Sequence, residues 1–411
     1  MENRYDKYKD SGIAWIGEIP EHWEVKRVKN ICSQTNIKEN SKGNPLPYIG
    51  LENIESGSGK YVDTTSEVDG IANRFCKNNV LFGKLRPYLS KVYLAKSDGI
   101  CSTEFIVYDT KENDCRFIHK LLLSQAFIEV VNSSTYGAKM PRANSDFINN
   151  IYVQIPPLSE QQSIATYLDQ KCSEIDELIT LQEEMITKLQ SYKQSVITEA
   201  VTKGLDKNVP LKDSGIEWIG EIPEHWEVKR LKNVCSQINI KENSKENSLP
   251  YIGLENIESG SGRYIDTTSE VEGMANRFCK NNVLFGKLRP YLSKVYLAEK
   301  DGICSTEFIV YDTKSNNCRF IHKLLLSQAF IEVVNSSTYG AKMPRANSDF
   351  INNIYVQIPP LSEQQSIADY LDQKCSEIDE LVSIKQQKVE KLKDYKKSLI
   401  FECVTGKRKV S

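Results

Sequence analysis

The chain has 411 residues and a mass of 46.8 kDa, which is enough for two or three domains of ordinary size. Its hydrophobic fraction of 40% and charged fraction of 26% are typical of a globular protein and exclude a disordered or fibrous chain. The 53 basic residues nearly balance the 55 acidic ones. A nucleic-acid-binding surface would therefore have to arise from local clusters of charge.

Secretion and membrane insertion are not expected from this sequence. No apolar run approaches the roughly 20 residues of a membrane-spanning helix, and the first ten residues contain no apolar stretch that could serve as a signal peptide. The 11 cysteines form no C-x-x-C pair, and with only four histidines no zinc-site spacing appears. We expect reduced, mostly buried thiols in a cytoplasmic protein.

An internal duplication dominates the sequence. Residues 10–202 return as residues 213–405 without a gap, at a constant offset of 203 positions. Both copies open with D-S-G-I, followed by W-I-G-E-I-P-E-H-W. Solenoid repeats have periods of only about 20 to 50 residues. The sequence therefore indicates a whole domain copied in tandem.

The first part of each copy, which ends at a proline pair, has the pattern of an α+β domain. In the first copy, residues 80–82 and 104–108 are short β-rich runs separated by Gly, Asn, Ser and Asp, which predicts strands joined by turns. Apolar residues at helical spacing predict one helix within residues 116–132.

A long helix is predicted after each proline pair. Ser159 and Gln162 resemble a capping box at its start, and no Gly or Pro interrupts residues 159–203; the second copy repeats the helix from Ser362. The apolar seam consists of Ile164, Leu168, Cys172, Ile175, Ile179, Ile186, Leu189 and Val196, with Ile367, Leu371, Cys375, Ile378, Val382, Val389, Leu392 and Leu399 in the second copy. One narrow seam needs a partner, and an antiparallel coiled coil between the two copies is the simplest arrangement. A strut packed on another surface is the alternative.

The two copies have diverged unevenly. Between residues 47–158 and 250–361, 8 of 112 positions differ, whereas 16 of 41 differ between residues 160–200 and 363–403. The seam nevertheless stays apolar in both helices. Two nearly identical globular parts on two different helices indicate a ligand that itself has two equivalent halves.

Catalytic motifs are missing from the sequence. We find no G-x-x-x-x-G-K-[ST] loop, no G-x-G-x-x-G after a strand, no H-E-x-x-H and no G-x-S-x-G. His22 and His119, with their copies His225 and His322, have no obvious nucleophile or ligand partner. A structural role is therefore favoured for the histidines, and nothing in the sequence supports an enzyme.

Basic residues cluster in two loops of each copy, F-G-K-L-R-P-Y at residues 82–88 and T-Y-G-A-K-M-P-R at residues 135–142. Each loop brings two cations and an aromatic residue together, as a contact with DNA phosphates or base edges requires. For the first loop, a surface turn whose arginine pairs with a nearby acid is an equally good interpretation. The candidate contacts are Lys84, Arg86, Tyr88, Lys139 and Arg142, with Lys287, Arg289, Tyr291, Lys342 and Arg345 in the second copy.

With these motifs the sequence resembles the specificity subunits of type I restriction-modification systems. The resemblance rests on D-S-G-I-x-W-I-G-E-I-P-x-H-W, L-R-P-Y, G-A-K-M-P-R and the helix entry P-P-L-S-E-Q-Q-x-I-A-x-Y-L-D. All are present twice, and together they cover nearly the whole chain.

The resemblance implies a DNA-recognition subunit that is not itself catalytic. It implies two target recognition domains, each reading one half of a bipartite double-stranded DNA site, and antiparallel helices that set the spacer. Two modification subunits would dock on the chain and methylate adenine with S-adenosylmethionine, and restriction subunits would supply ATP- and Mg-dependent cleavage where restriction occurs. No cofactor or metal is expected on this chain itself. The expected boundaries are residues 1–157 and 205–360 for the recognition domains, 158–204 for the central helix, and 361–411 for the C-terminal helix and basic tail.

The near identity of the two recognition domains is a departure from the family pattern. Antiparallel helices would relate the domains by a pseudo-twofold axis, so that identical readers would bind identical half-sites on opposite strands. The hypothesis is a half-site, a fixed spacer and the same half-site inverted. A direct repeat would imply parallel helices, and an asymmetric target would require discrimination by the differing positions, such as Lys60/Arg263 or Ser97/Lys300.

The long helices differ in charge. The first carries acidic residues and the second basic ones, which predicts selection of helix register, a docking face for the modification subunits, or simply solvated surfaces. The residues are Glu174, Asp176, Glu177, Glu183 and Glu184 on the first helix, and Lys385, Lys388, Lys391, Lys393, Lys396 and Lys397 on the second. Two other functions remain open, a free-standing DNA-binding regulator and a helical scaffold without a nucleic-acid role.

Overall fold

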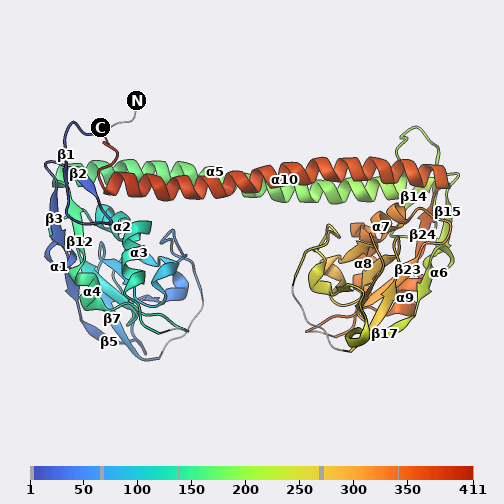
Figure 1. Ribbon diagram of the computed structural model, residues 1–411, viewed down its shortest axis with the longest axis horizontal. Helices are drawn as coiled ribbons and strands as arrows, with labels where there is room; N and C mark the ends of the chain where they lie inside the picture. The colour runs from blue at the N-terminus through green and yellow to red at the C-terminus, as the bar shows by residue number, and fades with distance from the viewer. Residues whose placement is uncertain (1–3, 65–68, 138, 268–272, 341, 411) are drawn as a thin grey trace. The chain divides into compact units, whose positions relative to one another are not determined.

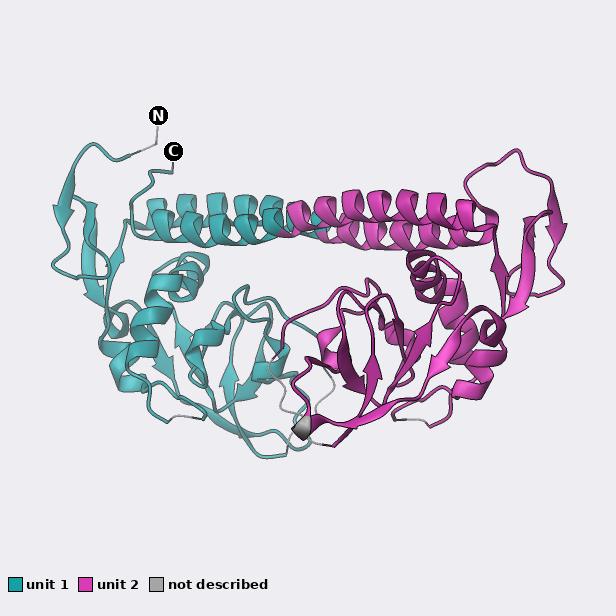
Figure 2. Ribbon diagram, turned by 45° about the vertical axis from the view of Figure 1, so that its right-hand side comes forward, with its two compact units in different colours: residues 1–182, 387–411 teal, residues 183–386 magenta. Residues whose placement is uncertain are grey.

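The computed structural model describes residues 4–64, 69–137, 139–267, 273–340 and 342–410. The chain forms two compact units: residues 1–182 with 387–411 make unit 1, and residues 183–386 make unit 2 (Figure 2). Both boundaries fall inside the long helices α5 (Leu158–Lys203) and α10 (Leu361–Val404). Each unit therefore combines one α+β domain with a segment of both helices, and the predicted α+β class is confirmed.

Unit 1 contains two four-stranded sheets, in the orders β5-β7-β10-β6 and β4-β11-β8-β9. The pairs β1-β2 and β3-β12 lie beside them, and all pairings are antiparallel except β6 with β10. The strands are β1 (Tyr8–Asp10), β2 (Glu18–Pro20), β3 (Glu24–Arg27), β4 (Ser33–Thr35), β5 (Lys38–Asn40), β6 (Tyr48–Ile49), β7 (Ile71–Phe75), β8 (Val80–Gly83), β9 (Val92–Leu94), β10 (Gly99–Ser102), β11 (Phe105–Asp109) and β12 (Tyr152–Ile155).

Short helices connect and cover these strands (Figure 1). They are α1 (Val28–Ile31), η1 (Leu51–Asn53), η2 (Pro87–Leu89), α2 (Cys115–Leu123), α3 (Gln125–Ser133) and α4 (Ser145–Asn150). The single helix predicted within residues 116–132 is wrong, because the chain breaks at Ser124. The backbone of Ser124 is extended, with ψ of 140°, and its hydroxyl donates to the Leu121 carbonyl at 2.7 Å. This local bond competes with a continuous helix.

Unit 2 repeats the same fold and sheet orders. Its strands are β13 (Leu211–Asp213), β14 (Glu221–Pro223), β15 (Glu227–Arg230), β16 (Ser236–Ile238), β17 (Lys241–Asn243), β18 (Tyr251–Ile252), β19 (Met274–Phe278), β20 (Val283–Gly286), β21 (Val295–Leu297), β22 (Gly302–Ser305), β23 (Phe308–Asp312) and β24 (Tyr355–Ile358). Its short helices are α6 (Leu231–Val234), η3 (Ser244–Glu246), η4 (Leu254–Asn256), η5 (Pro290–Leu292), α7 (Cys318–Leu326), α8 (Gln328–Ser336) and α9 (Ser348–Asn353).

The beginning of each long helix belongs to the core of its α+β domain. In unit 1, Ile164 and Leu168 are fully buried in the same apolar cluster as Trp23 and Phe117. Burial of each large apolar side chain contributes about 1.5–3 kcal/mol. This packing fixes the direction in which helix α5 leaves the domain.

The two long helices pair in antiparallel fashion, as predicted. In unit 1, Lys396 Nζ lies 2.6 Å from Asp176 Oδ1. In unit 2, Lys193 Nζ lies 2.7 Å from Asp379 Oδ2, and Lys385 Nζ lies 3.3 Å from Met185 Sδ. As the residue number increases along helix α5, the number of its partner on helix α10 decreases, so the two helices run in opposite directions.

The start of helix α5 differs from the prediction. The helix begins at Leu158, so Ser159 lies inside the first turn and does not form the predicted capping box. Gln161, and not Gln162, is the anchoring side chain: its amide donates to the Pro156 carbonyl at 2.9 Å and accepts from the Asp114 backbone at 3.0 Å. Tertiary contacts therefore position the helix start.

The ends of the chain complete unit 1. The Gln154 side chain donates to the Val404 carbonyl at 2.7 Å, and Lys407 Nζ donates to the Ile16 carbonyl at 2.9 Å. In unit 2, Gln357 makes the matching bond to the Val201 carbonyl at 2.8 Å. The C-terminal segment thus occupies in unit 1 the place that the end of helix α5 occupies in unit 2.

Two further expectations concern the thiols and membrane helices. All 11 cysteines are unpaired and seven of them are buried, which confirms the prediction that most are buried. Within the described ranges, no helix is both long and apolar enough to cross a membrane.

Candidate nucleic-acid interface

The two basic loops of each copy form a single surface, although about fifty residues separate them in the sequence. Arg86 donates its backbone N–H to the Pro141 carbonyl at 2.7 Å, and Ala143 donates to the Lys84 carbonyl at 3.0 Å. Leu85 and Arg142 form an isolated antiparallel bridge. These backbone bonds bring together the cations of both loops. From the sequence, the two loops could be identified only as separate basic clusters.

The first loop has a constrained backbone. Strand β8 ends at Gly83, and Arg86 then adopts a left-handed conformation with φ of 49°. Such a φ is uncommon for a residue other than glycine, and the ring of Pro87 fixes the φ of the residue that follows Arg86. The Leu89 backbone donates to the Arg86 carbonyl at 2.9 Å, which closes the turn. Tyr88 is left 51% exposed at the surface.

The second loop is a narrow hairpin in which Tyr136 and Arg142 exchange backbone hydrogen bonds of 3.3 and 3.1 Å. Gly137 takes a φ of 91° in this turn, and Ala138 and its copy Ala341 lie outside the described residues. Tyr136 and Met140 are 61% and 57% exposed, so large apolar groups accompany the cations. Tyr136 is the aromatic residue expected in this loop, although neither it nor Met140 is among the predicted contacts.

A carboxylate also belongs to this surface. Glu104, which directly precedes strand β11, places its Oε1 2.6 Å from Arg142 Nη2, and its carbonyl accepts from the Lys84 backbone at 2.9 Å. Burial lowers the pKa of Lys84, and Glu104 opposes this effect. An acid that pairs with an arginine was one interpretation of the first loop. The structure pairs this acid with Arg142 of the second loop.

Unit 2 reproduces this geometry. Arg345 Nη2 lies 2.5 Å from Glu307 Oε1, and Arg289, with φ of 50°, donates to the Pro344 carbonyl at 2.7 Å. Ala346 donates to the Lys287 carbonyl at 3.0 Å. Exposed aromatic residues recur at Tyr291 and Tyr339. The predicted residues of the second copy therefore also come together in one surface.

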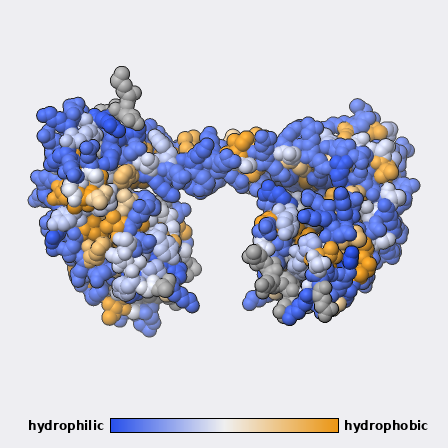
Figure 3. All heavy atoms as spheres, viewed as in Figure 1, coloured by the Kyte–Doolittle hydropathy of each residue, from blue (hydrophilic) through white to orange (hydrophobic). Residues whose placement is uncertain are grey.

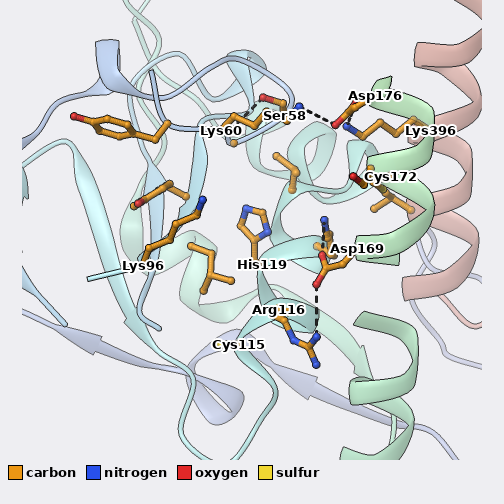
Figure 4. Close-up of a pocket in the computed structure, with 18 of the residues that line it drawn as sticks. Ser58, Lys60, Lys96, Cys115, Arg116, His119, Asp169, Cys172, Asp176 and Lys396 are labelled. Atoms are coloured by element: carbon orange, nitrogen blue, oxygen red, sulfur yellow. Dashed lines mark hydrogen bonds and ion pairs between the residues drawn. The ribbon is translucent and has the colours of Figure 1, made fainter. Parts of the chain in front are cut away.

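A cleft of 1310 Å³ lies within unit 1 between residues 58–61, helix α2 and the helix pair (Figure 4). Its acids face cations: Asp176 lies 2.9 Å from Lys60, and Asp169 lies 3.1 Å from Lys120. These interactions tie the loop and helix α2 of the α+β domain to helix α5. The charged residues that line the cleft therefore have a structural role in unit 1.

The histidines have structural contacts, as expected. His119 Nε2 bonds to the Val92 carbonyl at 3.1 Å, and burial lowers the pKa of His119 to about 4. His22 Nε2 lies 2.9 Å from Glu160 Oε1, and the Trp23 indole donates to the other oxygen of Glu160 at 2.6 Å. Their copies His322 and His225 make the same contacts in unit 2.

The charged stretches of the long helices pair less simply than their sequences suggest. Of the acidic stretch, Asp176 contacts the basic helix, whereas Glu174 pairs with Lys171 of its own helix. Unit 2 uses the opposite polarity, with a lysine from helix α5 and an aspartate from helix α10. The ion pairs between the helices are therefore equivalent in the two units, because each helix contributes an aspartate in one unit and a lysine in the other. A purely acidic helix facing a purely basic helix would not give this pattern.

Comparisons with known proteins agree with this architecture. Residues 20–190 and residues 223–393 each match the type I restriction modification DNA specificity domain. The chain is 25% identical to the type I restriction enzyme MjaVIII specificity subunit of Methanocaldococcus jannaschii, over 95% of this chain and 94% of that protein. It is 23% identical to the EcoDI specificity subunit of Escherichia coli, over 87% of this chain and 82% of that protein.

Solved structures show the same fold. A chain from a study of complex assembly and conformational transition of the type I R-M system superposes with a TM-score of 0.74 at 18% identity, covering 94% of this chain and 98% of its own. The HsdS subunit of Thermoanaerobacter tengcongensis superposes with a TM-score of 0.53, also at 18% identity and with the same coverage.

Proposed function

Because the chain belongs to the type I restriction modification DNA specificity family, we propose that its two domains bind the two halves of one bipartite DNA target, and that these halves are the same sequence in inverted orientation. The observation that carries the proposal is the duplicated interface. In each unit, backbone bonds join two basic loops into one surface with exposed tyrosines. The interface loops at residues 82–88 and 135–142 are identical in the second copy, so equal surfaces would read equal sequences.

The pairing of the helices supports the proposed inverted orientation. Each unit takes the first part of one long helix and the last part of the other, and the ion pairs Asp176–Lys396 and Asp379–Lys193 are counterparts in the repeat. Reciprocal pairing of this kind is typical of twofold-related elements, and twofold-related readers bind inverted half-sites.

We further propose that the chain recognises DNA without performing chemistry and binds no cofactor of its own. Adenine methylation would take place on two modification subunits that carry S-adenosylmethionine, because a target adenine must leave the stack to enter a methyltransferase pocket. Where restriction subunits join the complex, they would supply the ATP- and Mg-dependent cleavage. The complex would act in the cytoplasm, where unpaired cysteines are ordinary.

The surface of the helix pair supports docking of partners. Figure 3 shows hydrophobic side chains among hydrophilic ones along the helices. Leu178 and Leu181 are 44% and 53% exposed in unit 1, and Leu381 and Ile384 are 47% and 52% exposed in unit 2. Large apolar groups at a surface that is otherwise charged are typical of an interaction site.

A map of methylated adenine tests the proposal. DNA would be sequenced from cells that express this chain together with the methyltransferase encoded beside it, and from cells that lack this chain. We expect a bipartite motif with identical inverted halves only when the chain is present. A bipartite but asymmetric motif would contradict the symmetry. A stable complex with an active methyltransferase that leaves no new methylation would instead favour a free-standing DNA-binding regulator.

A further inference from the structure

The ion pair inside each interface divides its cations into two kinds. We propose that Glu104 and Glu307 are positioning residues that hold Arg142 and Arg345 for hydrogen bonds to a base edge, while Lys139 and Lys342 contact phosphate. This assignment rests on the proposed function, because it presupposes that these surfaces bind DNA. It goes further by stating which part of the DNA the arginine and the lysine of the second loop contact.

The pair is close and partly desolvated. Glu104 Oε1 lies 2.6 Å from Arg142 Nη2, and the Glu104 side chain is 22% exposed. The second carboxylate oxygen, Oε2, is buried and makes no hydrogen bond within the described part of the chain. Glu307 and Arg345 repeat this arrangement at 2.5 Å, with the Glu307 side chain 24% exposed and its Oε2 likewise buried and unbonded. The arginine is therefore the ion-pair partner on which each carboxylate depends.

A paired arginine is a poor phosphate contact. To bind phosphate, Arg142 would have to leave a partly buried carboxylate uncompensated, or bring the phosphate close to that carboxylate; both are unfavourable. The pair also has no net charge, so it displaces no condensed cation from DNA. Its other guanidinium N–H groups remain free to donate to an uncharged acceptor. The major-groove edges of guanine and thymine present such acceptors.

Lys139 provides the contrast within the same hairpin. It is exposed, and no carboxylate lies within ion-pair distance of it in the described residues. A lysine ammonium on a flexible stem is a point charge that suits phosphate and specifies no base geometry. Lys342 occupies the same position in unit 2.

The test uses the full-length chain in complex with its methyltransferase partner and compares three double variants. They are Arg142→Ala with Arg345→Ala, Lys139→Ala with Lys342→Ala, and Glu104→Gln with Glu307→Gln. Binding is measured over a range of salt concentrations to a duplex that carries the mapped methylation target and to a duplex with scrambled half-sites. The two readouts are the ratio of the two affinities and the slope of log affinity against log salt.

The expected results differ in kind. The lysine variant should weaken binding to both duplexes equally and reduce the salt slope by about 1.8, since each lost phosphate contact removes about 0.9. The arginine variant should leave the slope unchanged and reduce the affinity ratio by about 10-fold or more. The glutamine variant should reduce the ratio and raise the slope by up to about 1.8, because the freed arginines can then reach phosphates.

A reduction of the slope by about 1.8 in the arginine variant would overturn the assignment, as would a glutamine variant that loses affinity without a rise in slope. The second result is what a merely structural glutamate would give. If the glutamine variant does not fold, the comparison of the arginine and lysine variants decides by itself. If the wild-type complex does not distinguish the two duplexes, the proposed function fails, and this assignment fails with it.

Discussion

Buried histidines show how a single residue ties the recognition domain together. His119 on helix α2 bonds to the Val92 carbonyl of strand β9, and His322 repeats the bond to Val295. Gly59 lies against the same carbonyl, since a Cβ at this glycine would come within 2.1 Å of the Val92 oxygen. A neutral imidazole and a glycine therefore let helix, strand and loop meet closely, and neither can be changed without a loss of stability.

These histidines predict an acid-sensitive fold. Burial lowers the pKa of both His119 and His322 to about 4, below the ordinary value of about 6.5 for the unfolded chain. Because the pKa is lower in the folded state, the stability that each neutral histidine contributes is fully present above about pH 6.5 and is lost as the pH falls toward 4. Over this whole interval the loss is about 3 kcal/mol of unfolding free energy for each histidine. Calorimetry should find that the melting temperature falls less between pH 7 and pH 5 in a His119→Gln, His322→Gln variant than in the wild-type protein. Equal falls would show that other groups cause the acid sensitivity.

At the same scale, the interface shows the limits of sequence reasoning. Lys84, Arg86, Lys139 and Arg142 could be chosen because cations in loops with glycine, proline and aromatic residues suit DNA. Glu104 could not be chosen, because it lies in a β-rich run nearly forty residues before Arg142, and only the sheet brings the two together. A contact between residues that are distant in the chain is not marked by any motif of fixed spacing in the sequence.

Among the elements, the long helices were the most predictable. Their apolar seam is periodic from Ile164 to Val196 and from Ile367 to Leu399, and so long a periodic pattern is a strong signal for a helix. Short elements were less predictable: helices α2 and α3 are separated at Ser124, whose hydroxyl bonds to the Leu121 carbonyl, and the Gln161 side chain anchors the start of helix α5. Single hydrogen bonds of this kind lie at the ends of these helices, and the periodicity of apolar residues does not reveal them.

The exposed apolar residues of the helices predict how partners bind. Leu181 and Ile384 are counterparts in the repeat and are 53% and 52% exposed. Replacing both by glutamate should leave the fold intact, since neither is buried, but should weaken co-purification of the methyltransferase by placing charges in an apolar contact. Size-exclusion chromatography of the co-expressed proteins measures the complex. The matched control is Ser173→Ala with Ser376→Ala, also exposed, on the same helices and outside their charged stretches; equal loss of complex in both variants would contradict a specific apolar contact.

At the scale of the whole molecule, the chain builds two like units from a sequence that is continuous in only one of them. Unit 2 is one uninterrupted segment, whereas unit 1 is completed by residues 387–411. The bonds from Gln154 and Gln357 to equivalent carbonyls show that both units end up with the same internal packing. Equal packing around equal interfaces leaves the differing residues of the two domains as the one source of a difference in DNA sequence preference.

Those differences lie outside the interface loops, and several have structural explanations. Lys60 pairs with Asp176 of helix α5, whereas Arg263 pairs with Glu258 of its own loop. Asp114 and Asn317 both cap the following helix by accepting from two backbone N–H groups. Between residues 47–158 and 250–361 the eight differing positions are Lys60, Val62, Asp69, Ile71, Lys96, Ser97, Glu112 and Asp114, against Arg263, Ile265, Glu272, Met274, Glu299, Lys300, Ser315 and Asn317.

Replacing these eight residues of the second copy by those of the first removes every difference between residues 250–361 and residues 47–158, which contain both interface loops, and so tests the symmetry. If both domains already read the same half-site, the methylated-adenine map should keep its motif and spacer unchanged, because no residue of either interface loop is altered. The matched control carries Arg345→Ala alone, which should reduce methylation of the same motif by disabling one of two equal readers. A new or more symmetric motif after the eight replacements would mean that these positions discriminate between half-sites and that the natural target is asymmetric.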